Sequence, residues 1–198
     1  MYDYHSLLVN VIFLRSLLDL DRQVSRSVQV DRCQLCSSPL HQAAYPRLPR
    51  GVPAELVDAF SKRLSLCCGA RDCRKRTTPP SVCFLGRRQY IAATFVLLSM
   101  LRHGVTKQRA RQIHAEIPVD DRTLTRWRQW WRHELPLTPF RQAAAGRFAR
   151  PVPAADLPAG LLVTFIGDAA KKMTALLRFL SALSTASYRS GSGLAMAF

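Results

Sequence analysis

Apolar side chains recur at helical spacing in the second half of the chain. Steps of three and four residues separate Leu124, Trp127, Trp131 and Leu135. This spacing places the four side chains on one face of a helix. Asp120 stands at the position of an N-cap, where a side-chain oxygen accepts a hydrogen bond from the first turn. The pattern therefore predicts a helix that begins after Asp120 and buries its tryptophan-rich face.

The opposite face of this helix is polar and mostly cationic. At about 100° per residue, it carries Arg122, Arg126, Gln129 and His133. Another short helix is expected just before it, with Thr106 as its cap and Ile113 facing inward. Two short helices joined by a tight turn, the second presenting guanidinium groups, suit the major groove of DNA. We therefore predict a helix-turn-helix, with a purely structural helical hairpin as the alternative.

Four further segments show helical patterns, and they cover residues 6–18, 88–102, 140–150 and 169–184. The second is apolar around most of its circumference, so it should be the buried first helix of a three-helix unit. The last carries a stripe, typical of a core or of a homodimer interface through the C-terminal helix, at Met173, Leu176, Leu177 and Leu180. No apolar run is long enough to span a bilayer, which predicts a cytoplasmic protein.

All six cysteines lie between residues 33 and 83. Cys33 and Cys36 form a CxxC pair, whose spacing suits two thiolate ligands of one tetrahedral zinc ion. The second pair is expected from one of Cys67 and Cys68 together with Cys73. Short strands between the pairs would complete a zinc ribbon, a small fold that depends on its metal. Four protein ligands close the coordination sphere, so the zinc is predicted to be structural.

Adjacent side chains in a strand point to opposite faces, so only one of Cys67 and Cys68 is expected to be a ligand. We favour Cys68, because Gly69 directly after it would help the chain to turn. His41 is a substitute candidate, and Cys83 is interpreted as a non-ligand. The alternatives are buried free thiols, a disulfide, which the cytosol disfavours, and a redox pair, whose βαβ context is missing.

The chain is strongly basic, with a formal net charge of +16 from 29 Lys and Arg against 13 Asp and Glu. Most of the excess lies between residues 31 and 150, so this region suits a polyanion, and nucleic acid is the favoured partner. An anionic membrane surface is the rival, but the sequence has no lipid-anchor motif. The side chains expected to hold phosphates are Lys107, Arg109, Arg111, Arg74, Lys75 and Arg76.

Together these patterns predict a mainly α fold with a small β zinc ribbon and a three-helix helix-turn-helix unit that follows the ribbon. The expected divisions are an N-terminal helix in 1–30, the ribbon in 31–84, the helix-turn-helix domain in 85–136, and a helical tail with a Pro/Ala linker and a disordered end in 137–198. The ribbon should end near the TTPPS stretch at 77–81, because consecutive prolines do not continue a helix.

The succession CQLC, AYPRLPRG, FSKRLSLCCGARDCRKRTTPPSVCFLGRRQY and TLTRWRQWW resembles a bacterial family of zinc-ribbon plus helix-turn-helix proteins. These are related to the N-terminal regions of insertion-sequence transposases, and the resemblance covers residues 30–135. It implies DNA binding within a transposition-derived system, at the bacterial nucleoid. By position, it matches the metal ligands to Cys33, Cys36, Cys68 and Cys73, and the exposed start of the reading helix to Arg122, Thr123 and Arg126.

Two positions depart from the family pattern. Pro118 stands in the turn, where Gly is usual and where Pro cannot adopt a positive φ. Cys83 stands where an Arg is expected, which removes one phosphate contact or changes nothing.

Catalytic residues are not predicted. A nuclease of the three-carboxylate type needs acids gathered on a sheet to hold two metal ions. The segment after Leu135 contains only two, Asp156 and Asp168. We therefore expect a transposase-like DNA-binding protein that is not an enzyme and has no small-molecule substrate. Two other classes stay open: a regulatory or structural partner protein, and an RNA-binding module in which Trp130 stacks on single-stranded bases.

Overall fold

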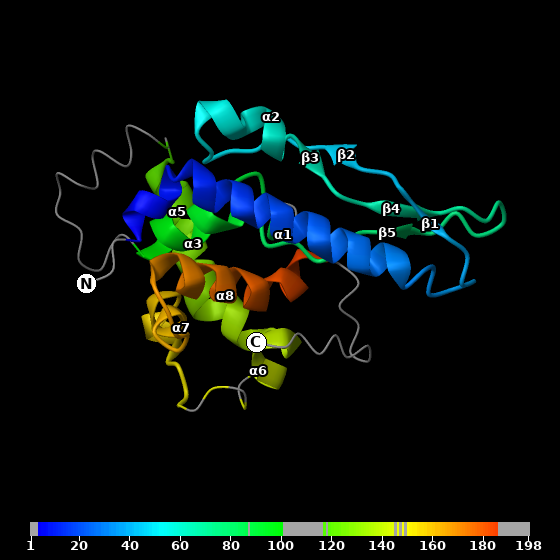
Figure 1. Cartoon of the computed structure of the whole chain (residues 1–198). Coiled ribbons are helices and arrows are strands. Elements are labelled where there is room, and N and C mark those ends of the chain that lie inside the picture. Colours follow the sequence, from blue (N-terminus) through cyan, green and yellow to red (C-terminus); the bar gives the residue numbers. More distant parts are fainter. Residues whose placement is uncertain are drawn as a thin grey trace.

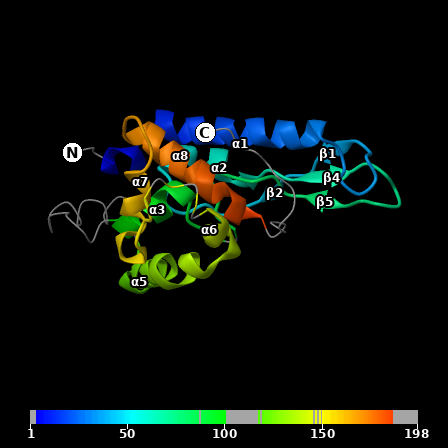
Figure 2. The ribbon, with the colours of Figure 1, turned by 90° about the horizontal axis from the view of Figure 1, so that it is seen from below.

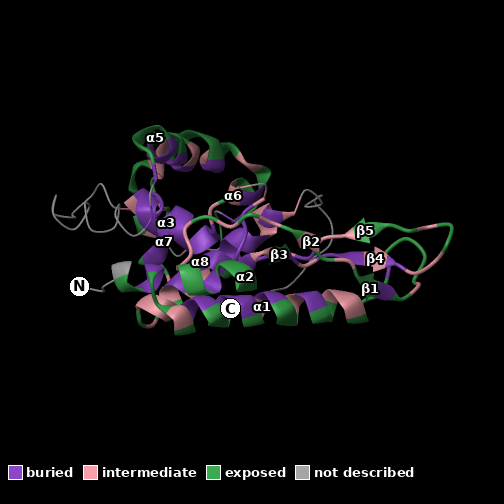
Figure 3. Cartoon of the chain, turned by 90° about the horizontal axis from the view of Figure 1, so that it is seen from above, coloured by how far each residue is buried: buried purple, intermediate pink, exposed green. Residues whose placement is uncertain are grey.

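The computed structural model describes residues 4–86, 88–100, 117, 119–144, 146, 148 and 150–185. Helices make up most of this part, with small sheets beside them, so the predicted mainly α fold with a few strands is confirmed. The helices gather into a helical body, from which strands project as an arm, here residues 33–77 (Figure 1, Figure 3). The views agree that the outer end of the arm lies far from α5 (Asp121–Gln129).

Helix α1 (Val11–Val30) runs along the body and reaches the arm (Figure 2). Asn10 caps it, because its Oδ1 accepts a hydrogen bond from the backbone N–H of Phe13 at 2.9 Å. The first turns bury apolar side chains in the body. At the other end, Gln29 Nε2 donates to the carbonyl oxygen of Leu40 at 2.9 Å. Helix α1 therefore packs against both parts of the molecule.

The predicted helix over 6–18 was wrong in extent. A 3-10 turn covers His5–Leu8, and α1 continues well past the expected end. The reason is that Asp21 and Ser25, two polar residues after that end, face inward and are buried. A polar side chain on the inner face interrupts the apolar periodicity without interrupting the helix.

A buried cluster of hydrogen-bonded polar groups explains the position of Asp21. Its Oδ1 accepts from the backbone N–H of Val82 at 2.7 Å, and its Oδ2 accepts from the hydroxyl of Ser81. The backbone N–H of Ser81 in turn donates to Ser184 Oγ at 2.8 Å. Burial raises the pKa of Asp21 above its ordinary value of 3.8, and the nearby charge of Arg63 opposes that rise. These hydrogen bonds thus connect α1, the segment after the arm and the C-terminal 3-10 turn that contains Ser184.

The arm is an antiparallel ladder made of two short sheets. Strands β1 (Leu40–Gln42) and β4 (Leu66–Cys68) pair at its outer end, β5 (Arg76–Thr77) adds to β4, and β2 (Tyr45–Pro46) pairs with β3 (Lys62–Arg63) further in. The backbone N–H of Ala43 donates to the carbonyl of Ser65 between the two sheets and links them. Between β2 and β3 the chain leaves the arm and enters the body as a 3-10 turn (Ala54–Leu56) and α2 (Val57–Phe60), where Leu56 and Phe60 are fully buried.

The other helices of the body are α3 (Ala92–Met100), α5, α6 (Pro139–Ala144), α7 (Ala159–Leu162) and α8 (Ala169–Ser181). Helix α3 lies within the predicted segment 88–102, and eight of its nine residues are buried, which confirms the expected buried helix. Helix α6 ends well before residue 150, so the predicted helix over 140–150 was too long.

The buried face of α5 matches the predicted pattern. All four predicted positions, Leu124, Trp127, Trp131 and Leu135, are buried. Trp131 stacks on Phe95 of α3 with ring centroids 5.3 Å apart. A π turn (Trp130–Glu134) and a 3-10 turn (Leu135–Leu137) follow α5, so the predicted single regular helix is interrupted.

Helix α8 and the 3-10 turn after it (Ala182–Ser184) coincide with the predicted helix over 169–184. Its apolar stripe, Met173, Leu176, Leu177 and Leu180, is buried in the core of this same chain. A homodimer through this helix stays a prediction, and it would have to use the outer face of α8. No helix within the described ranges is long and apolar enough to cross a membrane.

Candidate metal centre and nucleic-acid interface

Four cysteine side chains converge at the outer end of the arm. The sulfur atoms of Cys33, Cys36, Cys68 and Cys73 all lie within 4.8 Å of one another. Cys33 Sγ is 3.7 Å from Cys73 Sγ, and Cys36 Sγ is 3.4 Å from Cys68 Sγ. Tetrahedral thiolates at about 2.3 Å from a zinc ion would stand about 3.8 Å apart. The four thiols therefore fit a metal ion, and they are the four predicted ligands.

The remaining cysteines lie elsewhere. Cys67 points away from the cluster, and its Sγ lies 3.5 Å from the carbonyl oxygen of Arg74. This is the alternation expected of neighbouring strand residues. Cys83 is buried in the main core, where burial and Asp21 raise the pKa of its thiol. His41 is exposed and is not one of the clustered groups.

The same turn geometry follows both pairs of candidate ligands. Ser37 and Arg74, each directly after the second cysteine of its pair, have positive φ of 54° and 45°. The backbone N–H of Ser37 donates to the carbonyl of Cys33 at 2.8 Å, and that of Arg74 donates to the carbonyl of Ala70 at 3.1 Å. These turns direct both second cysteines toward the cluster. Neither turn contains glycine, so the sequence carried no signal for them.

Gly69 has a different role from the predicted one. Its φ is not positive, so it makes no special turn. A Cβ at this position would lie 2.6 Å from Nε2 of His41, on the neighbouring strand. The absence of a side chain at Gly69 therefore leaves room for the imidazole ring beside the metal ligands.

The thiols differ in acidity. Hydrogen bonds from Ser38 lower the pKa of Cys36 to about 6, whereas burial raises the pKa of Cys68 to about 12. Cys36 is exposed and Cys68 is fully buried, so Cys36 ionises first and offers a thiolate at the surface. A bound cation would then favour ionisation of the buried thiols. With four protein ligands, such a centre is closed and structural in type.

The basic residues of the arm lie next to the cysteine cluster. Arg74, Lys75 and Arg76, which were predicted to hold phosphates, are all exposed. Arg76 also donates through Nη1 to the carbonyl oxygen of Ala43 at 3.0 Å, which fixes it along the edge of the sheet. The outer end of the arm thus combines the candidate metal centre with a cationic surface.

The outer face of α5 carries the second cationic surface. Arg122, Arg126 and Gln129 are exposed, as is His133 in the π turn. Asp120 is the N-cap as predicted, because its Oδ1 accepts from the backbone N–H of Thr123 at 2.7 Å, and this bond lowers the pKa of Asp120.

Thr123 does not lie on this surface. It is buried, and its hydroxyl donates to Asp120 Oδ2 at 2.9 Å and accepts from Arg126 Nη2 at 3.1 Å. The expectation that Thr123 is exposed for contact with DNA was therefore wrong. Its hydroxyl serves the cap and holds the guanidinium of Arg126.

Part of the predicted interface lies outside the described residues. This applies to the phosphate-binding candidates Lys107, Arg109 and Arg111, to the expected cap Thr106 and to Pro118. Of the segments predicted to form a three-helix unit, the structure therefore describes the first as α3 and the last as α5.

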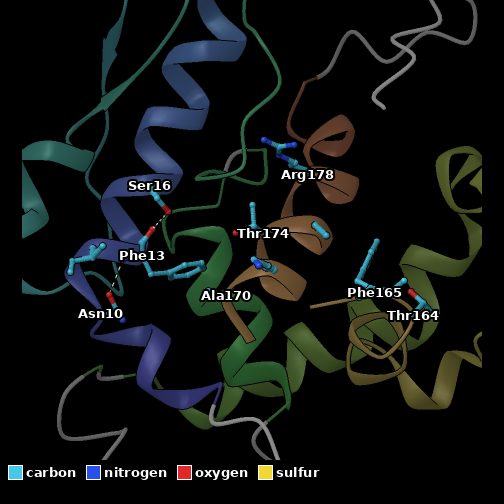
Figure 4. A pocket seen from close by; sticks show the side chains of 12 residues that line it. Asn10, Phe13, Ser16, Thr164, Phe165, Ala170, Thr174 and Arg178 are labelled. Carbon is cyan, nitrogen blue, oxygen red and sulfur yellow. Dashed lines mark hydrogen bonds between the residues drawn. The ribbon is translucent and has the colours of Figure 1, made fainter. Parts of the chain in front are cut away.

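A groove lies between the start of α1 and the α7–α8 region (Figure 4). It has a volume of about 920 Å³, and its lining is Asn10, Ile12, Phe13, Ser16, Thr164, Phe165, Ile166, Ala170, Lys171, Thr174, Ala175 and Arg178. This set is mostly apolar and contains two cations but no carboxylate, imidazole or thiol. The groove therefore offers no acid–base pair, and the chemistry-bearing groups are those of the arm and of α5.

The chain was compared with protein-family models, with curated proteins and with solved structures. None of the three comparisons finds a match. The similarity to transposase-related proteins therefore stays a resemblance in the motifs quoted above.

Proposed function

We propose that this protein binds duplex DNA through the outer face of α5. The observation that carries the proposal is the two-sided packing of this helix. Trp127 and Trp131 anchor one side in the core, while Arg122 and Arg126 are exposed on the other. A helix held in this way can enter the major groove without rearranging its own packing.

The exposed side chains suit the edges of bases. Arginine pairs with the two acceptors of guanine, and glutamine with the acceptor and donor of adenine. Arg122, Arg126 and Gln129 would read bases, and His133 would extend the contact into the π turn. The phosphate contacts would come from Lys107, Arg109 and Arg111 and, on the arm, from Arg74, Lys75 and Arg76. A net charge of +16 favours such binding at low salt.

The four-cysteine cluster is proposed to hold structural zinc. An all-thiolate set with these separations favours zinc over harder cations such as magnesium. Zinc bound there would have no open position for water, so its role is to hold the arm in shape. The protein is proposed to have no catalytic activity of its own and to act in a transposase-related system of a bacterial cytoplasm, an inference that rests on the motif resemblance.

Selection of bound sequences from a random duplex pool tests the proposal. We expect enrichment of a defined site, and a fall in affinity of roughly a thousandfold between low and moderate salt if about six phosphates are contacted. Arg126→Ala should cost about 1–3 kcal/mol on the selected site and relax the choice of base there. The matched control is Arg22→Ala, which removes the same charge from an exposed position on α1.

Two results would contradict this reading. An equal loss on every sequence would make Arg126 a phosphate contact. Tighter binding of single-stranded RNA than of duplex DNA would point to the other class of nucleic acid. Stacking of bases on Trp130 is disfavoured, because the Arg88 guanidinium lies 4.7 Å from its ring centroid and covers one face.

A further inference from the structure

The ladder of the arm runs from the cysteine cluster to the body as two sheets, which a backbone hydrogen bond links. At its outer end, Leu40 pairs with Cys68, one of the four clustered residues. The backbone N–H of Ala43 donates to the carbonyl of Ser65 at 2.8 Å, and that of Arg47 donates to the carbonyl of Ser61 at 2.7 Å. The seven steps from Leu40 to Arg47 span about 23 Å at the usual rise of a strand. A change at the cluster can therefore reach Arg47 through paired backbone.

Arg47 connects this ladder to the segment before α3. Its Nη2 donates to the carbonyl of Arg88 at 2.7 Å and to that of Gly86 at 3.2 Å. Its guanidinium also lies 5.3 Å from the ring centroid of Phe84, which is buried in the main core. Arg47 is half-buried, so both hydrogen bonds are partly shielded from water. The side chain of Arg47 thus fixes the backbone that carries Arg88.

Arg88 in turn contacts the end of α5. Its guanidinium lies 4.6 Å from the ring centroid of Phe95 and 4.7 Å from that of Trp130. Burial of this group lowers the pKa of Arg88, but an arginine remains charged. A cation beside two aromatic rings in a partly dry site is attracted to the electron-rich face of each ring. Arg88 therefore holds α3 and the π turn after α5 against each other.

A second contact between arm and body runs beside the first. The backbone N–H of Arg50 donates to the carbonyl of Gln89, and that of Ile91 donates to the carbonyl of Arg50, both at 3.0 Å. Tyr90, between these bonds, packs edge-on against Trp127 with centroids 4.9 Å apart. The inner end of the arm therefore meets two of the three tryptophans through residues 88–90.

We propose that the arm is a positioning element for α5, so that metal occupancy at the cysteine cluster sets the placement of α5 through Arg47 and Arg88. The expected consequence for DNA rests on the proposed function. The structural link rests only on the proposed metal at the four cysteines, and it is measurable in the absence of DNA. Arg47 and Arg88 are positioning residues, because neither is on the exposed face of α5.

The tryptophans of this chain can report changes around α5 through their fluorescence. All three of its tryptophans, Trp127, Trp130 and Trp131, lie in α5 or its π turn, whereas the clustered cysteines lie at the outer end of the arm. We would release the metal from the full-length zinc-loaded protein with a chelator and record tryptophan emission. Metal content is measured on the same sample, and far-UV circular dichroism checks that the body stays folded. In the natural sequence we expect metal release to move the emission to longer wavelength.

Substitution of Arg47 tests whether the link between the cysteine cluster and α5 runs through this residue. Arg47→Leu should still bind metal, but the emission shift on metal release should be lost, and Arg47→Lys should restore part of it. Arg50→Ala is the matched control, because Arg50 is exposed and contacts the body through its backbone. This control should keep the full shift. If Arg47→Leu does not fold, Arg88→Met serves instead, because it leaves the ladder intact and removes only the cation beside Trp130.

Two outcomes would overturn the proposal. One is an unchanged emission spectrum when the natural protein has lost its metal and remains folded. The other is a full shift in the Arg47→Leu and Arg88→Met variants. If the link holds and DNA is the partner, metal release should weaken DNA binding about fivefold or more. If the link holds but no DNA binding is found, the proposed function fails and the positioning role stands.

Discussion

The buried carboxylate of Asp21 provides a test of how the molecule is held together. Asp21 is 4% exposed and accepts hydrogen bonds from the backbone N–H of Val82 and the hydroxyl of Ser81. In Asp21→Ala, these two donors would stay buried without that acceptor, at about 1–3 kcal/mol each. The small cavity left by the carboxyl adds to this cost. We therefore expect Asp21→Ala to lower the free energy of unfolding by about 3–5 kcal/mol.

Urea unfolding followed by circular dichroism measures this loss. Asp19→Ala is the control, because Asp19 lies two residues earlier on α1 and its ion pair with Arg22 is more than half exposed at both partners. An exposed pair of this kind contributes at most about 1 kcal/mol. Equal losses in the two variants would refute the reasoning, because they would mean that Asp21 does not join the segments that it contacts.

The raised pKa of Asp21 also predicts a dependence on pH. Because burial raises the pKa in the folded state, folding favours the protonated carboxyl. The stability of the natural protein relative to D21N should therefore be greatest below the ordinary carboxyl pKa of 3.8. It should fall as the pH rises through the higher pKa of the folded state. A difference in stability that does not change across acidic pH would contradict this assignment.

Three further substitutions have definite expectations. Cys68→Ser should weaken the thiolate absorption bands of bound Co²⁺ and lower the affinity for the ion, because one of four thiolates is lost, whereas Cys67→Ser should leave both unchanged; equal loss would contradict the assignment of ligands. Gly51→Ala should cost about 2–4 kcal/mol in urea unfolding, because φ is +76° there and a Cβ would lie 2.5 Å from a buried side chain of α3. Gly146→Ala, with nothing within 4 Å, should change stability by less than about 0.5 kcal/mol. Trp131→Ala should cost about 3–5 kcal/mol in the same assay, and a loss below 1 kcal/mol would show that this ring is not central to the core.

The elements that the sequence predicts best are those whose apolar residues recur at regular helical steps. Helix α5 is one, because Leu124, Trp127 and Trp131 recur at regular steps and are all buried. Helix α8 is another, since its stripe contains no polar residue. The four clustered cysteines were predictable for a different reason: the CxxC spacing of Cys33 and Cys36 suits two ligands of one metal ion.

The features that the sequence did not reveal depend on how polar groups find hydrogen-bond partners. The length of α1 depends on Asp21, whose partners Ser81 and Val82 lie sixty residues away along the chain. The burial of Thr123 depends on its hydrogen bond with Asp120, only three residues away, which turns a polar side chain inward. The turns at the cluster place positive φ on Ser37, a residue type that gives no local signal for it. In each case the apolar periodicity of the sequence does not show how the polar group is bonded.

The orientation of the exposed face of α5 is likewise a property of the packed molecule. Helix α5 has only nine residues, and threonine, tryptophan and aspartate are weak helix formers, so the isolated segment would be largely unfolded in water. What keeps it helical is the set of rings and the cation that other elements supply, from Tyr90, Phe95 and Arg88. Because these groups contact Trp127, Trp130 and Trp131 on one side only, they fix which side faces outward. Arg122 and Arg126 are therefore held on the exposed side of α5 by residues that pack on its opposite side.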